Sequence, residues 1–175
     1  TEPVEFTVKR LNNTTLPAKD EEALDAYFAE LDETARKVYG TSSYLNDMIK
    51  KTATVKQTVL KTAAADKDLM AEVQALEDAL ADLRFKMHGV SAKASYEEIP
   101  HNKHPIYKLM INTYCTQSGY TSDVNETEKQ QLKIVQEQIA PVIEKLKALT
   151  DDMESIEQRL EDIKAPWTPG RLIED

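Results

Sequence analysis

The sequence predicts an all-α protein: an up-down bundle of three long helices and one short helix, preceded by a short extended arm. Apolar residues recur at alternating spacings of three and four along three long segments, which is the pattern of a helix with one buried face. The composition agrees, because only 6% of the 175 residues are aromatic and 4 are glycine. Short connections between most of these segments favour neighbouring helices with coiled-coil-like packing.

The longest unbroken pattern lies between residues 125 and 164. Its apolar positions are Leu132, Val135, Ile139, Val142, Leu146, Leu149, Met153, Ile156, Leu160 and Ile163. Charged side chains occupy the other faces, so this helix, roughly 55 to 60 Å long, must bury its apolar stripe against other helices. Pro141 lies in its middle, and we expect a kink there rather than a break, because the pattern stays in phase across the proline.

The ends of this helix carry their own signals. Asn125 followed by Glu128 resembles a capping box, in which each side chain accepts a hydrogen bond from the other residue's backbone N–H, and Thr127 is an alternative start. Pro166 and Gly170 are expected to end the helix.

A first long helix is predicted from about residue 20 to about residue 62. Its apolar stripe consists of Leu24, Phe28, Leu31, Ala35, Val38, Ser42, Leu45, Ile49, Thr52 and Val59. Gly40 lies inside this helix and costs about 1 kcal/mol relative to alanine. Because the pattern keeps its phase through Gly40, we expect a close crossing with another helix there rather than a break.

A second helix is predicted after a change of phase. The stripe fades beyond Val59 and restarts as Leu69, Val73, Leu76, Leu80, Leu83 and Met87. Asp66 is suited to cap the start of this helix, and His88-Gly89 is a typical helix end. The alanines at 63 to 65 would equally continue a helix, so the turn rests on the phase change alone.

A connection over residues 89 to 105 leads to a short third helix that begins near Pro105. Its expected inward positions are Ile106, Leu109, Met110, Thr113 and Tyr114. The loop over residues 118 to 123 then leads into the long helix at residue 125.

Residues 1 to 19 form the expected extended arm and linker. Val4, Phe6 and Val8 alternate with polar residues, ahead of the turn-forming Asn12-Asn13-Thr14-Thr15. Such an arm has an unpaired edge, so it either packs on the bundle or joins a sheet of a neighbouring domain. The second option suits the absence of an initiator Met, which we interpret as the mark of an excised or processed fragment.

Composition argues against several classes of function. The formal net charge of −9 disfavours a nucleic-acid-binding surface, which needs clustered Lys and Arg, and disfavours binding to anionic membranes. No window approaches the 18 or more apolar residues of a membrane span, so we expect no membrane insertion. The single cysteine, Cys115, forms no internal disulfide. The length suits one bundle domain, residues 20 to 175 with the tail included.

The histidines and the cysteine are the candidate reactive residues. His101 and His104 would need at least one further ligand to hold a metal, so we expect no metal and no cofactor. His88, at a predicted helix end, is expected to cap that end as an imidazolium favoured by the helix dipole. Cys115 has apolar neighbours and no histidine near it in the sequence, so we expect a buried, inert thiol and no catalytic residue.

The tail Ala165-Pro166-Trp167-Thr168-Pro169-Gly170-Arg171 holds the one tryptophan of the chain. Trp167, with Pro166, Pro169 and Arg171 around it, either staples the tail onto the bundle or faces a partner, since Trp and Arg are enriched at interfaces. We expect docking near the start of the first helix, around residues 11 to 24, with the indole N–H bonded to an oxygen. The prolines leave little conformational entropy to be lost on docking.

The tail stretch 165–172 resembles the ending of large bacterial proteins built from BNR-type β-propeller repeats, of the sortilin-like or glycosyl-hydrolase-like kind. Other stretches similar to this family are 6–11, 87–89, 106–120 and 139–142. The first of these looks like the strand that leaves the last propeller. Where the family often has a proline-containing turn between its first two helices, this chain has Ala64-Ala65-Asp66.

The resemblance implies a carboxyl-terminal helical domain that follows the propellers, in the bacterial cell envelope, periplasmic or exported. It carries over no catalytic residue, because the glycosyl-hydrolase label rests on propeller repeats that this chain lacks. The expected function is a non-catalytic structural or protein-interaction module, whose partner is the β-propeller domain or another protein. The alternative is a free-standing helical-bundle enzyme or metal-binding protein. A ferritin-like site would need Glu-x-x-His motifs in the core, and the predicted helices contain none.

Overall fold

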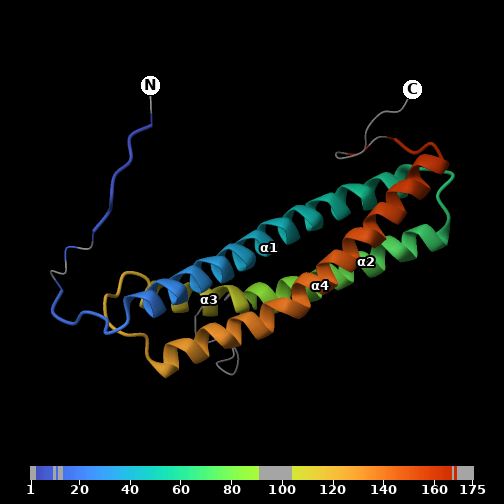
Figure 1. The fold of residues 1–175 in the computed structure, drawn as a ribbon. Helices are drawn as coiled ribbons and strands as arrows, with labels where there is room; N and C mark the ends of the chain where they lie inside the picture. The colour runs from blue at the N-terminus through green and yellow to red at the C-terminus, as the bar shows by residue number, and fades with distance from the viewer. Residues whose placement is uncertain (1–2, 10, 12–13, 91–103, 167, 169–175) are drawn as a thin grey trace.

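The computed structural model describes residues 3–9, 11, 14–90, 104–166 and 168, and within them the chain is all-α, as predicted (Figure 1). The helices are α1 (Glu21–Lys61), α2 (Lys67–His88), α3 (Ile106–Gln117) and α4 (Glu126–Asp162). These bounds agree with the predicted segments to within a few residues. The described residues contain no β-strand.

The helix starts are fixed by the side chains that the sequence indicated. The Asp66 carboxylate accepts a hydrogen bond from the backbone N–H of Leu69 at 2.7 Å. Asn125 and Glu128 form the reciprocal capping box, with backbone-to-side-chain distances of 3.0 and 2.9 Å. Asn125, and not Thr127, therefore caps the start of α4, and each cap satisfies backbone groups that a helix end leaves unpaired.

Helices α1 and α4 run parallel to each other. Among the hydrogen-bonded pairs that link them, three have residue numbers that differ by 106: Glu30 with Gln136, Tyr44 with Thr150, and Lys51 with Glu157. Helix α2 is antiparallel to α1, because residues late in α1 meet residues early in α2. Lys56 forms an ion pair with Glu77, whereas Ser42 contacts His88.

Helix α3 continues the course of α2 along α1. Tyr107, near its start, lies against His88 at the end of α2, with a ring-centroid distance of 5.0 Å. Gln117, at its end, meets Tyr27 near the start of α1. The end of α2 and the start of α3 are adjacent, since a Cβ added at Gly89 would lie 2.6 Å from Pro105 Cγ. The bundle thus has three columns: α1, α4, and α2 followed by α3 (Figure 1).

The predicted apolar stripes form the core. All six stripe positions of α2 are buried, as are the stripe positions of α4 from Leu132 to Leu160. Helix α4 passes through Pro141 without a break and bends midway along its length (Figure 1). On α1 the stripe is wider than predicted, because all three other helices pack on it. Tyr27, Met48 and Val55 are buried there, while Phe28 and Ile49 are only partly buried.

Leu45 and Leu60, both on α1, offer a matched test of this core. Leu45 is fully buried, so Leu45→Ala should lower the free energy of unfolding by about 2 to 5 kcal/mol through lost burial and the cavity left behind. Leu60 is 61% exposed, so Leu60→Ala should change that free energy by less than about 0.5 kcal/mol. Urea denaturation of the three proteins measures both effects, and equal losses would contradict the packing described.

Candidate interaction site

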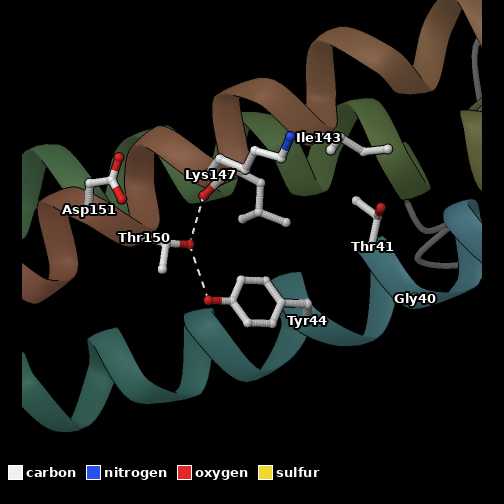
Figure 2. Close-up of a pocket in the computed structure, with 8 residues that line it drawn as sticks. Gly40, Thr41, Tyr44, Ile143, Lys147, Thr150 and Asp151 are labelled. Carbon is white, nitrogen blue, oxygen red and sulfur yellow. Dashed lines mark hydrogen bonds between the residues drawn. The ribbon is translucent and has the colours of Figure 1, made fainter.

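A groove lies between the parallel helices α1 and α4 near the middle of the bundle (Figure 2). Its volume is about 400 Å³. The residues that line it are Gly40, Thr41, Tyr44, Ile143, Leu146, Lys147, Thr150 and Asp151. We call this hollow the α1–α4 groove.

Gly40 forms an open part of the groove wall, and the prediction of a close helix crossing at this glycine is wrong. A Cβ added at Gly40 would meet no heavy atom within 4 Å. The backbone there is ordinary right-handed helix, so no unusual φ requires glycine either. Gly40 therefore costs helix stability, about 1 kcal/mol against alanine, without serving the packing of the described chain.

The groove has apolar walls and a polar rim. Ile143 and Leu146 contribute aliphatic surface from α4. The ring of Tyr44 reaches toward α4 from α1 (Figure 2). The Tyr44 hydroxyl is 3.1 Å from Thr150 Oγ1, and Thr150 Oγ1 in turn donates to the carbonyl of Leu146 at 2.9 Å. The hydroxyls of Tyr44 and Thr150 are thus hydrogen-bonded, and Thr41 on α1 adds one further hydroxyl at the groove (Figure 2). The surface between them is mainly apolar, which favours an apolar occupant.

Two opposite charges flank this apolar surface. Lys147 and Asp151 are one turn apart on α4, and both lie at the groove. The Lys147 ammonium is 2.8 Å from the Glu144 carboxylate, in a pair whose side chains are 68% and 72% exposed. An ion pair this exposed contributes at most about 1 kcal/mol, so Lys147 exchanges partners at little cost.

The tip of the arm, residues 3–9, is the second element of the site. Val4, Phe6 and Val8 are 84%, 83% and 82% exposed. In Figure 1 the tip runs away from the bundle instead of lying along it. Of the two options raised by the sequence, packing of the tip on its own bundle is therefore not what the structure shows.

The root of the arm, residues 14–19, is fixed to the loop between α3 and α4. The backbone N–H of Ala18 donates to the carbonyl of Thr121 at 2.6 Å. The N–H of Lys19 donates to the Asp123 carboxylate at 2.7 Å, and the Thr14 and Thr121 hydroxyls are 2.6 Å apart. The arm is thus held at the end of the bundle where α1 and α4 begin.

A buried polar cluster stiffens the same end. The Tyr27 hydroxyl donates to Gln117 Oε1, and Gln117 Nε2 donates to Gln131 Oε1 at 3.1 Å. Burial, together with the nearby Glu128 and Glu30 charges, raises the pKa of Tyr27 to about 12. The cluster ties α1, α3 and α4 together. The sequence pattern missed Gln117 because a polar residue on an inward helix face carries no periodic signal.

His88 does not cap α2 as the expected imidazolium. Its Nε2 is 3.0 Å from Ser42 Oγ on α1, and its ring lies against Tyr107. Burial lowers the pKa of His88, and the charge of Arg84 lowers it further. Desolvation is the larger of these two causes, and both favour the neutral imidazole. A Ser–His pair is also the start of a nucleophilic arrangement, but Ser42 is only 6% exposed, so the pair serves to hold α2 against α1.

Cys115 is exposed, so the expectation of a buried thiol is wrong. On α3 the inward positions are taken by Thr113 and Gln117, four residues apart. Cys115 lies midway between them in the sequence, and residues two apart on a helix do not share a face. The apolar neighbours of Cys115 in the sequence therefore gave no information about its own direction.

The metal and tail expectations fall partly outside the described residues. His101 lies outside them, and His104 is exposed. In the part of the chain that is described, no three His, Cys, Asp or Glu side chains gather as a metal site would require. No described helix is long and apolar enough to cross a membrane. Trp167, Pro169 and Arg171 also lie outside the described residues.

The tail begins at the opposite bundle end from the one expected. Arg159, in the last turn of α4, forms ion pairs with Asp66 and Glu72 at the start of α2. Because α3 continues α2, helix α4 starts beside the start of α1 and ends far from it. The proposed neighbourhood of residues 11 to 24 for the tail is therefore wrong. Ala165 and Thr168 are buried at this far end, and Pro166 is exposed.

No protein family, curated protein or solved structure matches this chain. The interpretation of the site therefore rests on its own geometry.

Two glycine variants test the groove and the α2–α3 junction. Gly40→Ala should raise the free energy of unfolding by up to about 1 kcal/mol, because alanine favours the helix and its methyl group meets open space. Gly89→Ala should lower it by at least about 1 kcal/mol, because Gly89 has a φ of 69° and its Cβ would clash with Pro105. Urea melts decide, and a destabilising Gly40→Ala would mean that another part of the chain fills the groove.

The pH dependence of stability tests the His88 contact. The pKa of His88 is lowered below 6.5 in the folded chain, so the unfolded chain takes up the proton first as the pH falls. The stability that His88 contributes is present above pH 6.5 and is lost as the pH falls through 6.5 toward the folded pKa. His88→Gln keeps a hydrogen-bonding group but does not titrate. Urea melts at a series of pH values should show wild type losing more stability than His88→Gln in this window, and parallel profiles would contradict the assignment.

Proposed function

We propose that this chain is a non-catalytic protein-interaction module, and that the arm tip is its contacting element. The observation that carries the proposal is the contrast within the arm. Residues 14–19 are pinned to the α3–α4 loop, whereas Val4, Phe6 and Val8 expose more than four-fifths of their surface. Alternation places these three side chains on one side of an extended segment. That arrangement suits docking onto another polypeptide.

Apolar contact alone gives the arm tip too little free energy to bind a partner tightly. Burial of three side chains of this size contributes roughly 5 to 9 kcal/mol. Ordering seven backbone residues costs roughly 7 to 14 kcal/mol. The ordering cost exceeds the gain from burial by a few kcal/mol, so a matching partner must also supply hydrogen bonds or charge pairs. The pinned root helps, because it has already removed part of the freedom of the arm.

The resemblance to BNR-repeat proteins supplies the wider context of the proposal. In that context the module stands carboxyl-terminal to β-propeller repeats and braces them, and the arm is the connector that leaves the last propeller. The location would then be the bacterial cell envelope, periplasmic or exported. The similarity of residues 6–11 to that connector supports this part of the proposal.

Photo-crosslinking tests the proposed role of the arm. A benzoylphenylalanine replaces Phe6 in the full chain, produced in bacterial cells, and illumination should join the chain to another polypeptide. The same probe at Phe85, a 60% exposed position on α2, is the control and should give far less product. Gel electrophoresis and mass spectrometry report the products. Absence of any polypeptide adduct at position 6, or equal adducts at both positions, would refute the proposal.

A further inference from the structure

We propose that the arm tip of one copy docks in the α1–α4 groove of a second copy, with the Phe6 ring in the hollow beside Gly40. This inference rests on the proposed function, since it names the partner of the same arm. Two observations carry it: the fit of the two apolar surfaces, and the length of the chain between the root and Phe6.

The groove and the arm tip are complementary in polarity. The groove offers the aliphatic surfaces of Ile143 and Leu146 and the ring of Tyr44, with no side chain at Gly40 to fill the space (Figure 2). Phe6 offers a ring that is 83% exposed. A glycine that serves neither packing nor backbone conformation within the chain allows a foreign ring to approach the backbone of α1 closely.

The length of the arm indicates that the groove is filled by the arm of a second copy and not by the arm of the same chain. The root is held as far as Thr14, whose hydroxyl bonds Thr121 at the start of the bundle. Eight residues separate Thr14 from Phe6, and they span at most about 29 Å. Gly40 lies about 30 Å beyond Asp20 along α1, and Tyr44 about 36 Å. The arm therefore falls short of its own groove while its root is held, and the groove of a second copy has no such limit.

Two copies would exchange arms reciprocally. Each copy carries one arm tip and one groove, so a two-fold arrangement fills both grooves and leaves no arm exposed. Two docked arms share one association event, so the second arm docks within an existing complex, which offsets part of the ordering cost that burial of a single arm does not recover.

Sedimentation equilibrium of the purified full chain tests the inference. Wild type should dimerise in a concentration-dependent manner. Phe6→Ser, which removes the ring, and Gly40→Leu, which fills the hollow, should each raise the dimer dissociation constant at least about tenfold. Phe85→Ser, at an exposed position away from the groove, should leave it unchanged. Circular dichroism verifies folding, and Gly40→Leu has the higher helix propensity. A wild type that stays monomeric, or a dimer insensitive to Phe6→Ser and Gly40→Leu, would overturn the inference.

The Phe6 crosslinker in a mixture of isotopically light and heavy purified chains separates this inference from the proposed function. Adducts that join a light to a heavy chain at α1 or α4 beside the groove support exchange. Adducts within one chain overturn the second-copy assignment. A monomeric purified chain that still crosslinks a different protein in cells overturns the second copy and leaves the proposed function standing. No adduct in either setting overturns both.

Discussion

The parallel pairing of α1 and α4 is the constraint on which the rest of the molecule depends. Two parallel helices cannot be joined by a short turn, so the chain must travel back the full length of the bundle between them. Helix α2 covers part of that return, and α3 covers the remainder. At the junction of the two helices, Tyr107 of α3 packs on His88 of α2. The pairing places the arm root and the starts of α1 and α4 at one end, and it leaves α4 ending beside Asp66 at the other.

The α1–α4 groove follows from the same pairing. The α2–α3 column packs on the shared apolar faces of α1 and α4, which leaves their outer seam without a third helix. Along most of that seam side-chain pairs such as Lys51 with Glu157 close the gap. At Gly40 the missing side chain leaves it open. The groove is therefore a local consequence of one residue in a regular seam, and its depth depends on that residue remaining small.

Local chemistry could be predicted from the sequence, and the order of the helices in space could not. Asp66 and the pair Asn125 with Glu128 cap helices within three residues of themselves, so their effect is visible in the sequence. The apolar stripes of α2 and α4 predicted their buried faces for the same reason. Whether α3 lies beside α2 or continues it depends on contacts across the bundle, and the error about the tail followed directly from that choice. Cys115 and Gln117 were misjudged because burial depends on the direction in which a side chain points, and one turn of a short helix leaves that direction undetermined.

The exposed arm tip and the open groove each lower the stability of the isolated chain. Val4, Phe6 and Val8 leave apolar surface in water, and Gly40 weakens a helix without aiding its packing. Each feature alone is a cost to the isolated chain, of the order of 1 kcal/mol for the glycine. Because residues 14–19 are held in the folded chain, part of the conformational entropy of the arm is already lost before binding. Docking of the tip therefore costs less entropy. Docking of the Phe6 ring beside Gly40, as proposed, would remove the apolar surface of that ring from water and would offset part of the cost of ordering the arm, while the helix-propensity cost of Gly40 would remain.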